Sequence, residues 1–367
     1  MTLLFIIDHF GSGGAQRQMV NLAIGLKQSG HDVNFFIYYP EYNFYRPELE
    51  KNSIKIIDYF KKRQGFSLGV CNALRKLLKS NKYNIALAYL DSPGIYLLLA
   101  GIGSKTKLIV SERSSYLAAL NRNCFLLKRQ LFRLADKIVV NSGTQKRWLV
   151  QSAGFSDEMV VTIYNGYNQA EFQYSKLEGF DGNCLNLIAI GGVRPVKNIE
   201  NLILALDLFH KKHKWLPSIS WVGKSDSLKY ERKIISMLQT RNEVKAVWRW
   251  LGERNDVPVL LADHHALISP SYFEGLPNVV CEALFAGKPV LASNICDNPV
   301  LIKDGVRGYL FDPKSPDSIV KAIERLLQLS NEEQREMSLR NRMYAEENLT
   351  LDEMVGKYIS LFNSVLN

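Results

Sequence analysis

Two glutamates in the C-terminal half of the chain, Glu274 and Glu282, have a spacing that suits the binding of one ligand at two points. An apolar strand is expected over 266–269 and a helix after it, so Glu274 falls in the turn and Glu282 about two helical turns further along. The backbone N–H groups at the start of such a helix attract anions. The pattern therefore predicts a site for a ligand with hydroxyl and anionic groups, which includes Gly275, Leu276, Pro277, Asn278 and Val279. Glu282 alone would be interpreted as a solvated helix residue, but the run at 287–290 completes a pattern that disfavours this alternative.

A second candidate ligand contact is the glycine-rich turn at 11–15, which joins an apolar strand expected at 3–7 to an amphipathic helix expected at 15–29. Glycines let the backbone approach a ligand closely, so Gly13 and Gly14 are candidate binding residues. Gln16 stands where the dinucleotide-binding fingerprint requires a third glycine, which argues against a nicotinamide or flavin cofactor. A tight turn without a ligand is the alternative.

Each half of the chain opens with the same elements, namely a strand, a glycine-rich turn and a helix. The expected strands are 3–7, 33–38, 85–89, 108–111 and 138–141 in the first half and 185–190, 218–222, 244–248, 266–269 and 289–293 in the second. Continuously apolar strands that alternate with helices indicate parallel sheets covered on both faces. We therefore predict an α/β protein with two Rossmann-like, doubly wound parallel-sheet domains that face each other across a cleft, where their strands end.

The polar stretch at 168–183 indicates the boundary between the two domains. We assign residues 1–172 to the N-terminal domain and 173–345 to the C-terminal domain. Two amphipathic helices are expected over 331–366, and the last segment, 346–367, is expected to return to the N-terminal domain.

The charge of the chain is concentrated in the N-terminal half. The net charge is +10, and residues 51–147 carry 19 Lys and Arg against 4 Asp and Glu, a local net charge of +15. This asymmetry indicates a surface for phosphates, nucleic acid or an anionic membrane, with a basic face that merely aids solubility as the alternative. Residues 117–137 interleave apolar and basic side chains and could form either an interfacial helix or an ordinary core helix.

Other compositional features exclude several classes. Five cysteines at wide spacings, with no Cys-x-x-Cys pair, are typical of a reduced cytosolic compartment without structural zinc. No apolar run reaches the length of a membrane span, and the first apolar stretch lacks the basic flank of a signal peptide. The adjacent His264 and His265 point different ways on a regular backbone, so we do not expect them to bind a metal.

Together these motifs resemble a retaining glycosyltransferase of family 4 with the GT-B architecture. The similarity covers nearly the whole chain and includes the glycine turn at 11–15, Tyr164-Asn165-Gly166, the loop 191–198, the Glu274-to-Glu282 pattern and 302–310. The resemblance implies that Glu274 contacts the donor sugar, that Glu282 holds the ribose, and that a basic pair after the first strand of the C-terminal domain binds the donor diphosphate. It also implies that the N-terminal domain binds the acceptor and the C-terminal domain the nucleotide sugar.

The sequence departs from the family pattern at two places. Lys197 matches the second residue of the basic pair, but Gly192 occupies the position of the family arginine. Arg194 either reaches the same phosphates or is an ordinary solvated arginine. The segment Ser111-Glu112-Arg113 resembles the branch that extends glycans on polyprenyl-diphosphate carriers, and there Glu112 would orient Arg113 near the acceptor. A surface ion pair between Glu112 and Arg113 is the alternative.

The resemblance implies transfer of a hexosyl or N-acetylhexosaminyl unit, with retention, from a nucleotide diphosphate sugar to a lipid-linked glycan. The base is expected to be uridine, and the catalytic residues Glu274, Arg113 and Lys197. No cofactor is expected, and the absence of Asp-x-Asp favours a reaction that requires no metal. The expected location is cytoplasmic, peripheral to the inner face of the membrane. A soluble acceptor and a non-catalytic sugar-nucleotide-binding subunit remain alternatives, and no nucleic-acid-binding module is recognisable.

Overall fold

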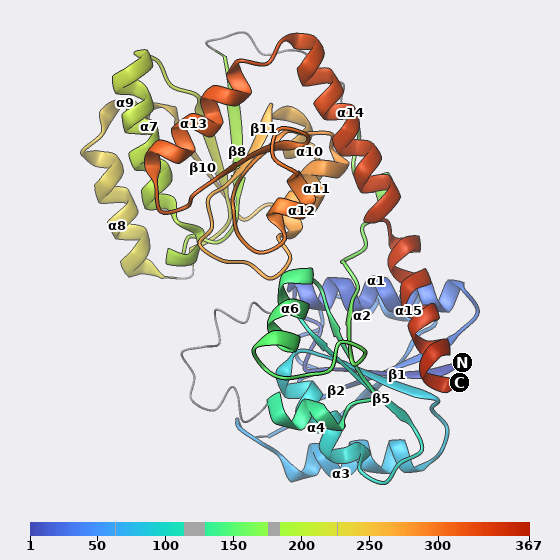
Figure 1. Cartoon of the computed structure of the whole chain (residues 1–367). Helices are drawn as coiled ribbons and strands as arrows, with labels where there is room; N and C mark the ends of the chain where they lie inside the picture. The colour runs from blue at the N-terminus through green and yellow to red at the C-terminus, as the bar shows by residue number, and fades with distance from the viewer. Residues whose placement is uncertain (63, 114–128, 175–183, 226) are drawn as a thin grey trace. The chain divides into compact units, whose positions relative to one another are not determined.

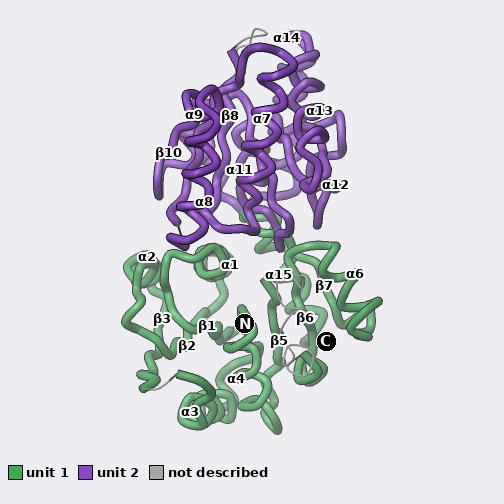
Figure 2. The backbone as a smooth tube through the Cα atoms, turned by 90° about the vertical axis from the view of Figure 1, so that its left-hand side faces the viewer, with its two compact units in different colours: residues 1–166, 350–367 green, residues 167–349 purple. Residues whose placement is uncertain are grey.

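The computed structural model describes residues 1–62, 64–113, 129–174, 184–225 and 227–367, and it divides the chain into two compact units (Figures 1 and 2). Unit 1 comprises Met1–Gly166 and Thr350–Asn367, and unit 2 comprises Tyr167–Leu349. The division falls a few residues before the boundary expected after residue 172. The segment that returns to the first unit begins at Thr350, shortly after the expected position 346.

Unit 1 contains a seven-stranded parallel sheet with the strand order β3-β2-β1-β4-β5-β6-β7. Its strands are β1 (Thr2–Ile7), β2 (Asp32–Ile37), β3 (Lys55–Asp58), β4 (Ile85–Tyr89), β5 (Lys107–Glu112), β6 (Lys137–Val140) and β7 (Val160–Thr162). Its described helices are α1 (Gly14–Gln28), α2 (Arg46–Lys51), α3 (Leu68–Lys79), α4 (Asp91–Gly101), the 3₁₀ helix η2 (Leu131–Leu134), α6 (Gly143–Gln151) and α15 (Leu351–Leu366). This is the doubly wound parallel architecture that the apolar strands predict.

Alternate side chains of the central strand β1 enter two separate cores. Leu3, Phe5 and Ile7 pack with α1, α2 and α15 on one face of the sheet. Leu4 and Ile6 pack with α3, α4 and α6 on the other face (Figure 1). Because successive side chains of a strand point to opposite faces, a strand covered on both sides must be apolar throughout. The sheet buries all of these side chains.

Unit 2 contains a six-stranded parallel sheet with the strand order β10-β9-β8-β11-β12-β13. Its strands are β8 (Asn186–Ile190), β9 (Ser218–Val222), β10 (Trp248–Gly252), β11 (Ala266–Ser269), β12 (Val290–Ser293) and β13 (Gly308–Phe311). Its described helices are the 3₁₀ helices η3 (Gln169–Glu171) and η4 (Pro195–Lys197), then α7 (Ile199–His213), α8 (Leu228–Gln239), α9 (Asn242–Val247), α10 (Val257–Asp263), α11 (Asn278–Phe285), α12 (Asn298–Ile302), α13 (Pro316–Leu327) and α14 (Asn331–Asn348). Both units therefore have the predicted fold class.

The strand predicted at 244–248 is wrong, because these residues are largely helical. Helix α9 occupies Asn242–Val247 and buries Val244 against α7 and α8, and the strand β10 begins only at Trp248. β10 lies at the edge of the sheet and is largely exposed, so it lacks the apolar run of a central strand. The apolar run that seemed to be the strand is the buried face of a short helix instead.

Most of the segment 117–137, which was expected to form an interfacial helix or a core helix, lies outside the described residues, which resume at 129. The part that is described changes into the 3₁₀ helix η2 at Leu131, and β6 begins at Lys137. Within the described residues, no helix has the length and the apolar character needed to cross a bilayer. The two predicted C-terminal helices are confirmed as α14 and α15, of which α15 packs on α1 in unit 1.

The contact between α1 and α15 can be tested at two helix glycines. A Cβ atom at Gly25 in α1 would lie 2.5 Å from Cγ2 of Val355, whereas a Cβ at Gly356 in α15 would meet nothing within 4 Å. Gly25→Ala should therefore lower the Tm through overpacking that costs about 1–3 kcal/mol, and Val355→Ala should partly relieve this loss in the double variant. The matched control Gly356→Ala should raise stability by about 1 kcal/mol through helix propensity. A Gly25→Ala variant that gains stability like the control would contradict this packing.

Candidate donor and acceptor sites

The strand order of unit 2 reverses between β8 and β11, which are neighbours in the sheet. In doubly wound sheets, ligands bind beyond the carboxyl ends of the strands at such a reversal. The loop after β8 spans residues 191–198, and the loop after β11 spans 270–277. These two loops contain Lys197 and Glu274, so the topology alone brings both sequence-predicted residues to the place where a ligand is expected.

Lys197 and Glu274 form an ion pair at this edge of the sheet. Nζ of Lys197 donates to Oε1 of Glu274 at 2.7 Å, and the two side chains are only 15% and 19% exposed. Gly191 leaves the space that the lysine occupies, since a Cβ atom there would lie 2.8 Å from Cε of Lys197. The lysine is therefore held in one position, and partial burial reduces the screening of its charge by solvent.

Asn198 fastens the two loops to each other. It is fully buried in a left-handed conformation (φ 55°), and its Nδ2 donates to the carbonyls of Pro270 at 2.9 Å and Pro313 at 2.7 Å. The backbone N–H of Tyr272 also donates to the carbonyl of Val196 at 2.8 Å. Asparagine tolerates the left-handed region better than most residues, which explains its place at this turn.

Cys296 holds the backbone of Glu274, a role that the sequence did not reveal. Its thiol donates to the Glu274 carbonyl at 2.7 Å and accepts from the Glu274 N–H at 3.4 Å. The sequence around a single cysteine in a loop contains no motif that predicts such a contact. The two hydrogen bonds fix the turn from which the Glu274 carboxylate projects toward Lys197.

Glu282 lies about one turn into α11, where burial and the nearby Glu171 raise the pKa of its carboxyl from 4.5 to about 7. Within the described part of the chain, its carboxylate has no hydrogen-bond or ion-pair partner. The start of the same helix is held by Tyr167, whose hydroxyl donates to Oδ1 of Asn278 at 2.7 Å. An unpaired, partly buried carboxyl lowers the stability of the ligand-free protein and is suited to accept hydrogen bonds from the hydroxyl groups of a ligand.

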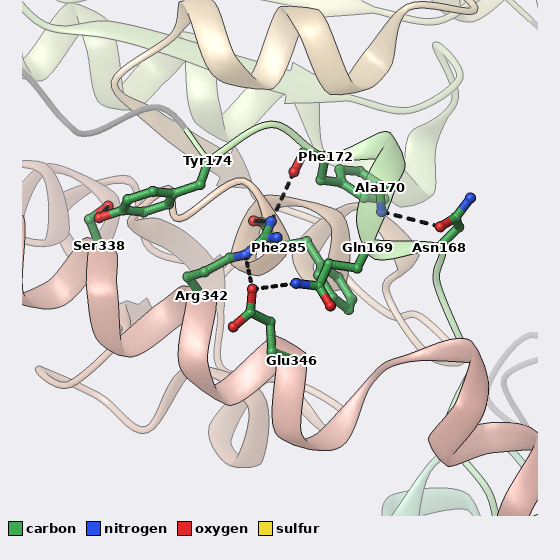
Figure 3. A network of polar contacts seen from close by, with 9 residues as sticks. All are labelled: Asn168, Gln169, Ala170, Phe172, Tyr174, Phe285, Ser338, Arg342 and Glu346. Atoms are coloured by element: carbon green, nitrogen blue, oxygen red, sulfur yellow. Dashed lines mark hydrogen bonds and ion pairs between the residues drawn. The ribbon is translucent and has the colours of Figure 1, made fainter.

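The segment that carries Glu171 is fastened to the rest of unit 2 by α14 (Figure 3). Arg342 donates to the carbonyls of Phe172 at 2.9 Å and Phe285 at 2.6 Å, so it ties the segment to the end of α11. Glu346 accepts from Nε of Arg342 at 2.5 Å and from Nε2 of Gln169 at 2.7 Å. These contacts keep the negative charge of Glu171 close to Glu282, and no sequence motif indicates them.

Arg194 and Gly192 lie on the β8 loop, as the sequence predicts. Arg194 is exposed and precedes the 3₁₀ helix that contains Lys197, and its carbonyl accepts from the Lys197 N–H at 2.9 Å. The two basic residues thus share one turn of backbone. The binding of the same phosphates by Arg194 and Lys197 stays a prediction.

Gly13 and Gly14 belong to unit 1, where Gly13 caps the start of α1 and Gly14 is its first residue. The N–H of Gly13 donates to the carbonyl of Gly11 at 2.8 Å, which closes the tight turn. A Cβ atom at Gly13 would lie 2.2 Å from Oε1 of Gln16. The turn therefore presents the N-terminus of a 15-residue helix at the carboxyl end of β1.

Glu112 does not orient Arg113, so both interpretations of this pair as mutual partners are wrong. Adjacent residues at the end of a strand point to opposite sides. Glu112 is buried and accepts at Oε2 from Nη1 of Arg129 at 2.5 Å and from Nε2 of Gln145 at 2.7 Å. Burial raises the pKa of Glu112 to about 7 although Arg129 opposes the rise, and Asp91 adds to it.

Arg113 instead lies in a cluster that the C-terminal helix completes. Its Nη2 donates to Oδ1 of Asn165, and its guanidinium stacks over the ring of Tyr89 with 4.5 Å to the centroid. The hydroxyls of Tyr89 and of Tyr358 in α15 are hydrogen-bonded at 2.8 Å. The N–H of Gly166, which follows Asn165, donates to Oε1 of Gln18 at 3.1 Å. The sequence named Arg113 but could not indicate these distant partners.

The described residues contain no group of three or more His, Cys, Asp or Glu side chains that could hold a metal ion. Nδ1 of His264 is hydrogen-bonded to the carbonyl of Leu260 at 2.7 Å, and Nδ1 of His265 accepts from the N–H of Asn186 at 3.0 Å. The two histidines thus support the start of β8 and the end of α10.

Comparison with known proteins relates both halves of the chain to glycosyltransferases. Residues 173–344 match the family model "Glycosyl transferases group 1", and residues 12–171 match "Glycosyltransferase Family 4". The chain is 30% identical, over 69% of each protein, to the Escherichia coli "UDP-Gal:alpha-D-GlcNAc-diphosphoundecaprenol alpha-1,3-galactosyltransferase". It is 25% identical, over 100% of its own length and 99% of the relative, to the Campylobacter jejuni "GalNAc-alpha-(1->4)-GalNAc-alpha-(1->3)-diNAcBac-PP-undecaprenol alpha-1,4-N-acetyl-D-galactosaminyltransferase".

Solved structures share the fold over the whole chain. HepE from Anabaena in complex with UDP superimposes with a TM-score of 0.84 at 19% identity and covers 99% of this chain and 100% of its own. A glycosyltransferase from Rickettsia africae gives a TM-score of 0.85 at 18% identity, with 100% and 98% coverage. These likenesses confirm the predicted GT-B fold.

The raised pKa of Glu282 predicts how stability depends on pH. A carboxyl with a pKa of about 7 in the folded state binds its proton more tightly than in the unfolded chain, so its contribution is complete below about pH 4.5 and is lost as the pH rises through 7. Glu282→Gln should therefore leave the Tm nearly unchanged at pH 4 and raise it at pH 8, by a gain of about 1–3 kcal/mol. Calorimetry at both pH values checks this, with the exposed Glu243→Gln of α9 as control. Equal effects of Glu282→Gln at pH 4 and pH 8 would contradict the raised pKa of Glu282.

Proposed function

Because the chain belongs to glycosyltransferase family 4, we propose that this glycosyltransferase moves a hexosyl or N-acetylhexosaminyl unit, with retention, from a nucleotide diphosphate sugar to a polyprenyl-diphosphate-linked glycan. The observation that carries the donor assignment is the ion pair between Lys197 and Glu274 at the strand reversal of unit 2. Glu282, on the helix that follows Glu274, supplies a second carboxyl for the same ligand.

Lys197 is the group that stabilises the leaving diphosphate. The bond between the anomeric carbon and the phosphate oxygen breaks, and the oxygen of the acceptor hydroxyl forms the new bond on the same face of the sugar. The acceptor proton passes to the departing phosphate, so atoms and charge balance without a protein nucleophile. A fixed ammonium group stabilises the charge that develops on the phosphate, and such preorganisation contributes strongly to catalysis.

Glu274 and Glu282 have different tasks in this proposal. Glu274 faces the reacting sugar and positions Lys197 through their ion pair. Glu282 accepts hydrogen bonds from the ribose hydroxyls, which compensates for the burial of its carboxylate. The helix start at Asn278 adds backbone N–H groups for the diphosphate, so this site needs no metal to balance the donor charge.

The proposal that the nucleotide is UDP and the acceptor a lipid-linked glycan draws on one solved structure and two relatives. HepE was solved in complex with UDP, and the names of the Campylobacter jejuni and Escherichia coli relatives specify undecaprenol-linked acceptors. In this chain, Arg113 is the group that would meet the acceptor or its diphosphate, since Tyr89 and Asn165 hold its guanidinium at the end of β5. Glu112 would not touch the acceptor itself. It supports the end of β5 through its buried contacts with Arg129 and Gln145.

The donor assignment predicts different kinetic defects for the two glutamates. A screen of nucleotide sugars for thermal stabilisation and transfer first identifies the donor. Glu282→Gln should then weaken donor binding by about 1–3 kcal/mol and act mainly on KM. Glu274→Gln and Lys197→Ala should lower kcat, by about 10²–10³-fold for the lysine.

Arg194→Ala is the matched comparison for Lys197→Ala, because both remove one positive charge from the same loop. A defect as severe as that of Lys197→Ala would mean that Arg194 replaces the family arginine missing at Gly192. Near-native kinetics of both glutamate variants would contradict the donor site. A wild-type chain that binds the donor without transferring or hydrolysing it would favour a non-catalytic binding subunit.

We also propose that unit 1 binds the anionic inner face of a membrane by charge. Lys62, Lys76 and Lys79 are exposed, and the stretch 51–147 that contains them has a net charge of +15. Arg63, next to Lys62, lies outside the described residues. Each basic residue near such a surface contributes about 1 kcal/mol, and the attraction decays over about 8 Å at physiological ionic strength.

Replacement of Lys62, Lys76 and Lys79 by Gln should weaken sedimentation with anionic vesicles by about tenfold or more at low salt. The control variant replaces Lys229, Lys245 and Lys321 of unit 2 by Gln, and because it makes the same change in total charge it should sediment nearly as well as the wild type. If both variants lost binding equally, net charge rather than this surface would be responsible. If the wild type failed to sediment with any vesicle, a soluble acceptor would be favoured.

A further inference from the structure

The loop between β3 and α3 presents large apolar side chains to solvent. Phe60 is 71% exposed, Phe66 is 56% exposed, and Leu68, the first residue of α3, is 72% exposed. Soluble proteins normally bury such side chains, because each one transferred from water to an apolar environment lowers the free energy. A group of them at the surface marks an interaction site. We call Phe60, Phe66 and Leu68 the apolar tip.

The loop is held in place by Lys61, which follows Phe60. Its ammonium group lies 5.3, 5.1 and 5.6 Å from the ring centroids of Tyr38, Tyr39 and Tyr96. Its backbone N–H donates to the carbonyl of Tyr38 at 3.2 Å. Lys61 is therefore enclosed by aromatic rings and serves the structure of the loop, whereas Lys62 beside it is exposed.

The other end of the loop is held by Tyr96 of α4. Its hydroxyl accepts from the N–H of Ser67 at 2.8 Å, and its ring stacks on that of Phe66 with 5.1 Å between centroids. The Ser67 hydroxyl in turn accepts from the N–H of Val70 and caps α3. Because both ends are fixed, the exposed side chains of the tip are held outward by the fold.

The sequence that contains the apolar tip is rich in basic residues. Between Asp58 and Asp91 the sequence has seven Lys and Arg residues and no Asp or Glu. Exposed apolar side chains with basic neighbours suit the boundary between anionic headgroups and acyl chains, where aromatic rings are also favoured. A protein partner of mixed charge would require acidic residues as well, which this stretch lacks.

The apolar tip also lies at the edge of the sheet that carries the proposed acceptor group. It follows the carboxyl end of β3, and Arg113 follows the carboxyl end of β5 in the same parallel sheet. Parallel strands all end at one edge. A surface contacted by the tip would therefore face the edge from which Arg113 meets the acceptor.

We propose that Phe60, Phe66 and Leu68 insert into the interfacial layer of an anionic membrane and hold the carboxyl edge of the unit 1 sheet against it. This inference rests on the proposed function, in that a lipid-linked acceptor presents its diphosphate at that layer. Insertion of apolar area adds a component of binding that salt does not screen, in contrast to the attraction of Lys62, Lys76 and Lys79.

The test is sedimentation of the full chain with vesicles of phosphatidylglycerol and phosphatidylcholine at low salt and at about 0.5 M salt. The wild type should keep a salt-resistant bound fraction. The variant Phe60→Ser/Phe66→Ser/Leu68→Ser should lose that fraction and bind at least about tenfold more weakly at low salt. The control Ile102→Ser removes an apolar residue that is 55% exposed, close to the 56% of Phe66. It lies before β5, at the opposite edge of the sheet, and this variant should bind like the wild type.

Phe66 stacks on Tyr96, so its replacement also removes a contact of the loop. Phe60→Ser alone gives a second measurement at a side chain that stacks on no ring among the described residues. Wild-type, salt-resistant binding by both variants would overturn the proposal, as would complete loss of wild-type binding in high salt. Sugar transfer to a water-soluble, short-chain acceptor distinguishes failure of the membrane proposal from failure of the proposed function. The tip variant should retain this transfer, whereas a wild type that transfers no sugar at all would overturn the proposed function instead.

Discussion

The ion pair between Lys197 and Glu274 depends on one feature of topology, the adjacency of β8 and β11 in a sheet where the strand order reverses. The helices that follow the two strands depart in opposite directions, so the loops between strand and helix remain side by side at the sheet edge. Gly191 then provides room for the lysine, and Asn198 joins the loops through two carbonyls. The site is thus a consequence of the fold combined with a few residues that permit close approach.

Within this frame the two carboxyl groups differ in their electrostatic surroundings. Glu274 has a cation at 2.7 Å, whereas burial and Glu171 oppose ionisation of Glu282. An unpaired carboxyl of this kind lowers stability in the ligand-free state, and hydroxyl groups of a ligand would offset that cost. The contacts of Arg342 and Glu346 maintain the arrangement, because they hold the segment that carries Glu171 against the rest of unit 2 (Figure 3). In the proposed account, the carboxyl of Glu282 lowers stability in exchange for binding.

The sequence was sufficient to predict the fold class, because parallel strands covered on both faces are apolar throughout and leave a clear pattern in β1, β4 and β8. The same rule failed at 244–248, where a short helix buries one apolar face beside an exposed edge strand. The short strands β3 and β7 were also missed, since few of their residues are buried. Local pattern identifies central elements better than edges.

The candidate site was predictable to the extent that it depends on local sequence. Glu274, Glu282 and Lys197 lie in loops or helix starts with recognisable spacing, and the strand order brings the first and last together. Contacts between residues far apart in sequence left no signal, as for Cys296 with Glu274 and Tyr358 with Tyr89. The pairing of Glu112 with Arg113 was wrong for a related reason. Neighbours at a strand end point apart, and their true partners lie elsewhere in the chain.

The central claim is that Glu282 and Lys197 bind the nucleotide part of the donor, and calorimetric titration of UDP tests it most directly. If ribose hydroxyls bond to the Glu282 carboxylate, its pKa falls on binding, and near pH 6.5 the complex releases protons. Titrations in two buffers with different ionisation enthalpies should reveal this release in the wild type and its absence in Glu282→Gln, with Lys197→Ala binding more weakly. Equal proton release in the wild type and Glu282→Gln, together with unchanged affinity of Lys197→Ala, would contradict the account.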